Sequence, residues 1–108
     1  MADLDFDLTA VRDERGACRL TLRGELDLAT AARLEQALAE AGDEVLIDLR
    51  GLTFMDSTGV RELLEAAERN GRGLRIIAPE TGQARVTIEE TGIAALLPLV
   101  EADGEAQP

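Results

Sequence analysis

The sequence contains neither histidine nor lysine, and the two absences exclude several kinds of catalytic site. Without histidine there is no Ser-His-Asp triad, no Cys-His pair and no imidazole ligand for zinc. Without lysine there is no phosphate-binding loop of the Walker A type and no Schiff-base nucleophile. We therefore expect a protein that is not an enzyme and that needs no cofactor and no metal.

Cysteine and aromatic residues are nearly absent too. The one cysteine, Cys18, can form neither an internal disulfide nor a cysteine-based zinc cluster, which fits a reducing compartment. It precedes residues 19–22, which alternate as in a strand, so we interpret Cys18 as a small buried hydrophobic residue. Aromatic residues make up only 2% of the chain, which leaves leucine, isoleucine, valine and alanine to build the core.

Long apolar runs are missing as well. None approaches the length that a membrane-spanning helix needs, and the first residues are acidic rather than basic, unlike a signal peptide. We expect a cytoplasmic protein with no membrane insertion. Nothing in the pattern argues for an oligomer, so the free protein is expected to be a monomer.

What the sequence does contain is the composition of one acidic domain. Its 108 residues are 45% hydrophobic and 31% charged, enough for a core and a soluble surface. The net charge of -11 repels phosphate backbones, so we expect no direct binding of nucleic acid and instead attraction of a basic protein partner. The pattern assigns residues 1–100 to the domain and residues 101–108 to an acidic tail that is expected to be disordered.

The hydrophobic periodicity predicts an α/β fold. A two-residue period over residues 4–9 and 18–26 predicts an antiparallel hairpin, and the helical period recurs in three later segments. Thr30 is a candidate N-cap of the first helix and Gly42 its stop. Residues 45–49 are almost continuously apolar, as in a strand covered on both faces. The predicted architecture is a mixed sheet of four to five strands with flanking helices. The helices are expected near residues 31–41, 60–70 and 81–90, with a strand at 74–78 and a short helical turn at 93–97. Residues 98–100 are expected to form a last edge strand or a docking segment.

The loop expected at residues 52–60 carries the most chemistry. Asp56, Ser57 and Thr58 are all N-cap residue types, and one of them capping the next helix would account for the pattern. The other interpretation is that Ser57 accepts a phosphate, which would meet the positive end of the helix dipole and free backbone N–H groups. Sequence alone favours neither interpretation.

Other chemistry for these residues is less consistent with the sequence. Ser57 has no histidine or lysine to act as a base, which argues against a hydrolase. A receiver domain, which is phosphorylated on its own aspartate, would need a lysine, and this chain has none. Asp48 and Asp56 could hold Mg²⁺ in principle, but we interpret both as solvated surface carboxylates.

Three motifs stand in order along the chain: Gly24-Glu25-Leu26-Asp27, Phe54-Met55-Asp56-Ser57-Thr58-Gly59 and Thr91-Gly92-Ile93. Together they resemble the motifs of the STAS family (sulfate transporter and anti-sigma factor antagonist). The second motif is similar to the family's phosphorylation site, with Thr58 in place of the usual second serine. Arg61 and Glu62 depart from the small or apolar residues of many relatives, and we interpret them as a solvated face.

The resemblance implies an anti-sigma factor antagonist regulated by partner switching. Its unphosphorylated form would bind an anti-sigma factor that is a serine kinase and so free the sigma factor. Phosphorylation at Ser57 would break the complex, and a PP2C-type phosphatase would restore it. The implied partner-binding residues are Asp27, Asp56, Ser57, Thr58 and Gly59. The alternative is a constitutive docking subunit of a lipid-transport or stress-signalling complex.

Overall fold

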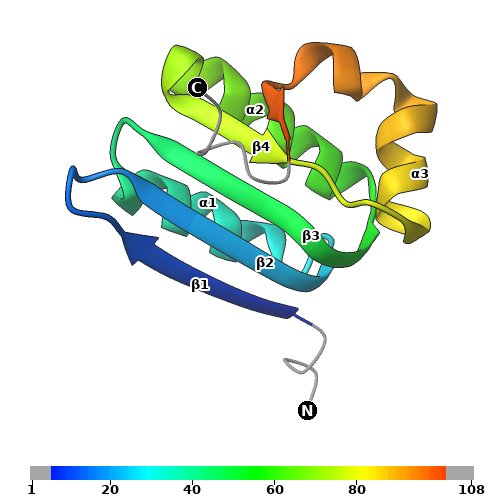
Figure 1. Ribbon diagram of the computed structural model, residues 1–108. Coiled ribbons are helices and arrows are strands. Elements are labelled where there is room, and N and C mark those ends of the chain that lie inside the picture. Colours follow the sequence, from blue (N-terminus) through cyan, green and yellow to red (C-terminus); the bar gives the residue numbers. More distant parts are fainter. Residues whose placement is uncertain (1–5, 102–108) are drawn as a thin grey trace.

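The computed structural model describes residues 6–101, apart from the side chain of Arg72 (Figure 1). The expected start of the first strand at Leu4 and the expected tail beyond residue 101 lie outside this range. The elements in chain order are β1 (Phe6–Arg12), β2 (Cys18–Leu26), α1 (Ala31–Ala41), β3 (Val45–Met55), α2 (Ser57–Asn70), η2 (Gly71–Gly73), β4 (Leu74–Ile77), α3 (Gly82–Thr91), η3 (Ile93–Leu96) and β5 (Leu99–Val100).

The strands form one mixed sheet in the order β1-β2-β3-β4-β5. β1 pairs antiparallel with β2, and the other neighbouring strands pair in parallel. The predicted α/β class, the N-terminal hairpin and the short last strand at the sheet edge are all confirmed.

The helices pack on one face of this sheet. Each parallel strand is added on the same side of the one before it, so right-handed crossovers place successive helices on the same face. α1 and α2 accordingly lie together behind the sheet in Figure 1, and α3 lies at the end where β3 terminates. Val45, Ile47 and Leu49 of β3 belong to the buried core that these helices cover.

The expectation that helices cover both faces of the strand at residues 45–49 is wrong. Leu46 and Asp48 alternate with the core residues of β3, and among residues 6–101 no helix covers the face on which they lie (Figure 1). Both residues are nearly buried, with exposures of 4% and 5%, as the apolar pattern predicts. Long neighbouring side chains cover them, however, rather than a second layer of helices. We call this side the open face.

Residues outside the strands behave largely as the sequence predicts. Cys18 is buried in the core, and α1 ends before Gly42, whose φ of 93° favours glycine. α3 packs through Ala84 and Ile88. No helix in the described part of the chain is both long and apolar enough to cross a membrane.

Candidate functional site

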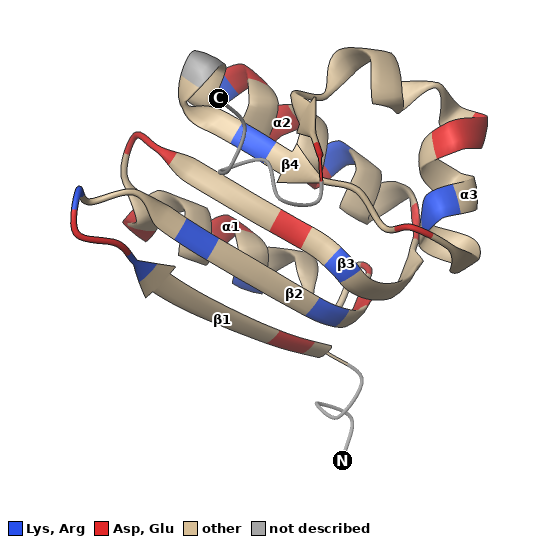
Figure 2. Ribbon diagram, viewed as in Figure 1, with Lys and Arg blue, Asp and Glu red and all other residues tan. Residues whose placement is uncertain are grey.

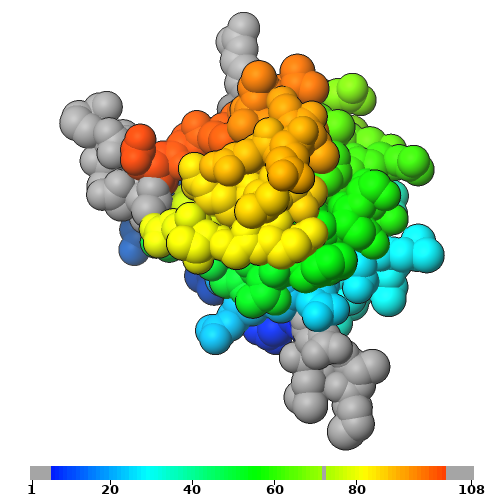
Figure 3. Space-filling view, turned by 90° about the vertical axis from the view of Figure 1, so that its right-hand side faces the viewer, coloured from blue at the N-terminus to red at the C-terminus, as the bar shows by residue number. Residues whose placement is uncertain are grey.

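The carboxyl ends of β2 and β3 bring the predicted site residues to one edge of the sheet. Leu26 and Met55, the last residues of the two strands, are register partners, so Asp27 and Asp56 follow them side by side. The Asp56 backbone N–H donates to Leu26 O at 3.3 Å. Figure 3 looks onto this edge, where the β2–α1 turn, the start of α2 and the start of α3 share one surface.

Asp56 is the residue that caps α2. Its Oδ1 accepts hydrogen bonds from the backbone N–H of Thr58 at 2.9 Å and of Gly59 at 3.2 Å. The capping interpretation is therefore confirmed for Asp56. The predicted loop at residues 52–60 is wrong, because β3 continues to Met55 and only Asp56 separates it from α2. Pairing with β2 through two irregularities in register keeps residues 52–55 in the strand.

Ser57 is the first residue of α2, and its side chain is exposed. A group attached there stands at the positive end of the helix dipole, as the sequence predicts. The N–H groups of Thr58 and Gly59, however, are already donated to Asp56. The expectation that they are free for a phosphate is wrong, and a phosphate on Ser57 would instead lie close to the Asp56 carboxylate.

Gly59 is buried beneath the site rather than exposed on it. A Cβ at this position would come within 2.7 Å of Met55 Cγ and 2.9 Å of Leu26 O. The glycine therefore lets the first turn of α2 lie directly against the ends of β2 and β3. Its position fits a packing role, while Asp27, Asp56, Ser57 and Thr58 lie nearer the surface.

Asp27 organises the turn that leads into α1. Its Oδ1 accepts from the backbone N–H of Ala29 at 3.0 Å and of Thr30 at 3.2 Å. Thr30 Oγ1 accepts from the Asp27 N–H at 2.9 Å and donates to Glu25 O at 2.9 Å. Thr30 occupies the predicted N-cap position of α1, but its side chain makes no capping hydrogen bond, because its hydroxyl faces back to β2. Two side chains thus hold the turn rigid beside Ser57.

Two further residues at this edge were missed by sequence reasoning. Gln83 of α3 clamps the end of β3: its Oε1 accepts from Met55 N at 2.8 Å and its Nε2 donates to Met55 O at 3.2 Å. Leu28, in the β2–α1 turn, is 78% exposed. The exposed leucine between two polar residues could have been read from the turn pattern, but no sequence signal pairs Gln83 with Met55.

The expectation of a solvated face at Arg61 and Glu62 holds only for Arg61. Glu62 is 8% exposed and faces α1. Burial raises its pKa, and the charge of Glu35 on α1 raises it further. Arg69 lowers that pKa only in part, since its Nη2 is 3.6 Å from Glu62 Oε2, within ion-pair range but beyond a hydrogen bond.

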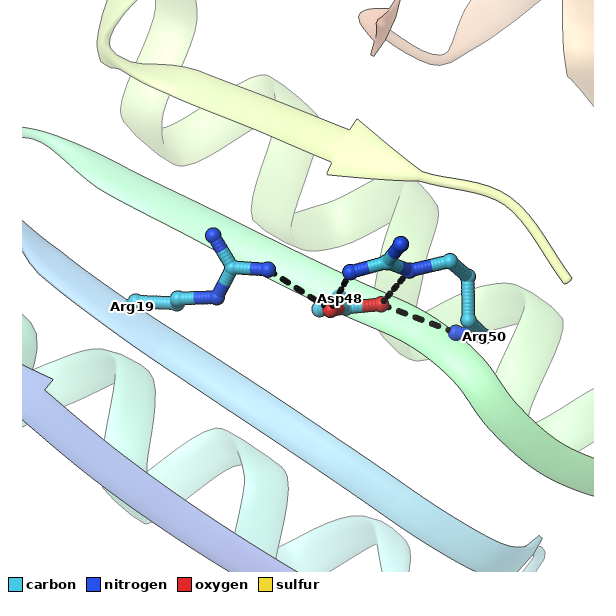
Figure 4. Close-up of polar contacts among 3 residues, drawn as sticks. All are labelled: Arg19, Asp48 and Arg50. Atoms are coloured by element: carbon cyan, nitrogen blue, oxygen red, sulfur yellow. Dashed lines mark hydrogen bonds and ion pairs between the residues drawn. The ribbon is translucent and has the colours of Figure 1, made fainter. Parts of the chain in front are cut away.

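Asp48 lies on the open face rather than at the site, and it is not a solvated carboxylate (Figure 4). Its Oδ2 accepts from Arg19 Nη2 at 2.8 Å and from Arg50 Nη2 at 2.7 Å, and its Oδ1 accepts from Arg50 Nε at 3.0 Å. Burial raises the pKa of Asp48, but the hydrogen bonds from Arg50 and Arg19 outweigh it and hold the pKa at about 2. The two guanidinium groups leave no role for Asp48 in Mg²⁺ binding. Within residues 6–101 no three acidic or cysteine side chains gather as metal ligands would.

Comparison with known proteins identifies relatives across most of the chain. Residues 9–101 match the family model described as Mlab, STAS domain. The anti-sigma-F factor antagonist RsfB of Mycobacterium tuberculosis is 33% identical over 79 residues, which cover 69% of this chain. The match spans 65% of the length of that relative.

Solved structures agree on the fold. An anti-sigma factor antagonist from Mycobacterium paratuberculosis superposes with a TM-score of 0.74 at 28% identity, over 87% of this chain and 84% of that one. The STAS domain of an antisigma-factor antagonist from Rhodobacter sphaeroides gives 0.56 at 26% identity, over 68% and 87%. Unphosphorylated SpoIIAA shares the fold, with a TM-score of 0.69 at 22% identity over 92% of this chain and 90% of its own.

Proposed function

The chain belongs to the STAS domain family, and from that premise we propose that it is an anti-sigma factor antagonist whose partner binding is switched by phosphorylation of Ser57. The observation that carries the proposal is the exposed Ser57 at the first turn of α2, held between the Asp56 cap and the rigid Asp27 turn. The similarity to two mycobacterial antagonists supports it.

In the unphosphorylated state this edge is the docking surface for an anti-sigma factor that is itself a serine kinase. Leu28 offers 78% of its surface for apolar contact, and Asp27 and Asp56 offer carboxylates to a basic partner. The elements beneath are fixed by hydrogen bonds, so little has to be ordered on binding. Binding withdraws the anti-sigma factor from its sigma factor.

Phosphorylation weakens the complex by adding charge to this surface. A phosphate brings nearly two negative charges next to Asp56, whose carboxylate already accepts from the N–H groups of Thr58 and Gly59. The complex would have to bury that charge without a partner, whereas the isolated domain keeps the phosphate in solvent near the helix dipole. The domain stays folded and only its affinity changes. A PP2C-type phosphatase resets the switch.

The chain itself supplies a binding surface rather than a catalyst. The partner kinase provides the base and nucleotide for phosphoryl transfer, and Ser57 provides only the accepting hydroxyl. Ser57 is the single serine of the sequence, so a serine kinase has one possible target. We place the protein in the cytoplasm, without nucleic acid as a direct ligand and as a monomer when free.

Capture from host lysate tests the proposal. Immobilised wild type and Ser57→Ala should both retain a kinase-type anti-sigma factor, identified by mass spectrometry, and Ser57→Asp should not. Gln36→Glu, which adds the same charge on exposed α1 surface, is the matched control and should bind as wild type does. Incubation with the captured kinase and ATP should label wild type and leave Ser57→Ala unlabelled.

A second candidate is the constitutive docking subunit of a lipid-transport or stress-signalling complex. It is favoured by the description of the matching family model, and it would use the same edge with Ser57 serving only at the helix start. Recovery of transporter subunits by wild type and Ser57→Asp alike would establish this role and refute the phosphorylation switch.

A further inference from the structure

The open face of the sheet concentrates positive charge in an otherwise acidic protein. Four of the eleven arginines lie on it, and Figure 2 shows them in blue on the strands facing the viewer. Asp7 of β1, Glu25 of β2 and Asp48 of β3 are the acidic residues of the described strands that share this face. We call this surface the arginine face; its arginines are Arg19 and Arg23 of β2, Arg50 of β3 and Arg75 of β4.

The strand register places two of these arginines on either side of an apolar residue. Arg19 of β2 pairs with Leu46 of β3, and Leu46 pairs with Arg75 of β4. Neighbouring strands are about 4.8 Å apart, so the two arginine Cα atoms stand about 10 Å from each other across Leu46. Val11 of β1, 65% exposed, extends the same row at the far side of Arg19.

This row forms a hollow of about 240 Å³ in the surface. Its lining includes Val11, Arg19, Leu46 and Arg75, together with Asp13, Ala17 and Cys18. Arg75 has no ion-pair partner among the described residues, in contrast to Arg19 and Arg50, which both pair with Asp48. The hollow therefore combines an apolar floor with an unneutralised guanidinium group.

We propose that the arginine face is a second docking surface, which binds an acidic segment of a protein partner in extended conformation. In the polyproline II form of an extended segment, side chains three residues apart lie on the same side and about 9 Å from each other, close to the separation of the two arginine Cα atoms. An apolar side chain of the segment would rest on Leu46. Guanidinium groups form bidentate hydrogen bonds with carboxylates, so such a contact is directional as well as electrostatic. Long polyanions such as nucleic acid are disfavoured by the net charge of -11.

The hollow and Ser57 lie at opposite ends of the sheet. Leu46 is the second residue of β3, and Ser57 lies two residues beyond its last residue, Met55, so about 30 Å of strand separates the two sites. Both surfaces can be occupied at once, so the domain would hold two partners. This inference does not depend on phosphorylation of Ser57.

Fluorescence anisotropy with a defined probe tests the proposal. The probe is a labelled dodecapeptide of four Glu-Leu-Ser repeats, with a Gln-Leu-Ser peptide as its uncharged counterpart. Wild type should bind the glutamate peptide saturably, and a rise in salt from about 50 to 300 mM should weaken binding. Arg75→Gln should weaken binding by about tenfold, the scale of one lost charge-assisted contact.

Two matched variants locate the binding. Arg61→Gln removes the same charge from the exposed start of α2, and Ser57→Asp alters the other site; both should bind the probe within about twofold of wild type. Equal affinity of Arg75→Gln and wild type, or absence of saturable binding, would overturn the proposal.

The other possible occupants give different results. Asp103→Asn/Glu105→Gln neutralises the acidic side chains of residues 102–108 in the full chain. About tenfold tighter probe binding by that variant would assign the face to the chain's own C-terminal segment and overturn a partner role. A concentration-dependent dimer that Arg75→Gln abolishes would assign it to a second copy, with the same consequence.

Discussion

At the scale of single residues, two buried carboxylates experience opposite environments. Asp48 accepts hydrogen bonds from two arginines and is stabilised in its charged form. Glu62 is buried between α1 and α2 with no hydrogen-bond donor at its Oε2, and its environment favours the neutral form. The two residues therefore affect the pH dependence of stability in opposite directions.

Asp48→Asn should cost stability at neutral pH, by about 2 kcal/mol for a pKa held at about 2 against 3.8 in the unfolded chain. Because the folded pKa is lowered, the contribution is complete above pH 3.8 and is lost as the pH falls from 3.8 to about 2. Urea unfolding between pH 7 and pH 3 should show a difference in the free energy of unfolding between Asp48→Asn and wild type that decreases only below about pH 4. Asp43→Asn is the exposed control; a pH-independent gap for Asp48→Asn would contradict this account.

Glu62→Gln should stabilise the domain at pH 7, on the order of 1 kcal/mol for an unsatisfied buried group that no longer carries charge. Since the pKa is raised in the folded state, the wild-type penalty appears as the pH rises above 4.5 and is absent below it. The gain should therefore vanish in acid. Glu68→Gln, on the exposed side of the same helix, should change little. A destabilised Glu62→Gln at pH 7 would show that the Arg69 ion pair outweighs burial.

At the scale of elements, the site depends on how the end of β3 is held. β4 stops at Ile77, opposite Asp48, so the last residues of β3 have no strand on that side. Gln83 takes the place of the strand at Met55, donating to and accepting from its backbone. α3 thereby fixes the strand end from which Asp56 and Ser57 project.

Gln83→Met keeps the side-chain length but removes both hydrogen bonds to Met55, which is fully buried. Stability should fall by about 1–3 kcal/mol, the cost of leaving a buried backbone group unpaired. The Met55 amide should also exchange with solvent much faster, measured by hydrogen exchange. Gln36→Met on exposed α1 surface is the matched control. Unchanged exchange at Met55 would contradict the clamp.

The sequence predicted most elements because their periodicity is local. The hairpin alternation, the helical spacing before Gly42 and the short last strand all follow from neighbouring residues. The length of β3 did not, because residues 52–55 are held by β2 rather than by their own pattern. Apolar composition likewise could not tell a covered sheet face from one shielded by arginine side chains.

Local patterns predicted the site only where its residues are neighbours in the sequence. Asp56, Ser57 and Thr58 are contiguous, so helix-start chemistry identified them. Asp27 was placed beside them only through resemblance to a family, and strand register confirms that neighbourhood. Gln83 meets Met55 across 28 residues, a contact that only tertiary packing creates.

At the scale of the whole molecule, the proposed function depends on helices that pack on one face of the sheet. One sheet edge presents Ser57 among acidic and apolar groups, and the open face presents arginines. The proposed phosphorylation of Ser57 would change the charge of the edge without breaking a hydrogen bond that holds the fold. Circular dichroism and thermal melting of phosphorylated protein should therefore match those of unmodified protein, and a large loss of helix would contradict the account.

The most direct test of the phosphorylation switch is a calorimetric titration of the purified anti-sigma partner with wild type, Ser57→Asp and the charge control Gln36→Glu. Ser57→Asp should bind more weakly by about tenfold or more, as for a charge introduced into a central contact, while Gln36→Glu should bind as wild type does. Equal affinities of wild type and Ser57→Asp would contradict the switch and leave Ser57 as the first residue of a helix.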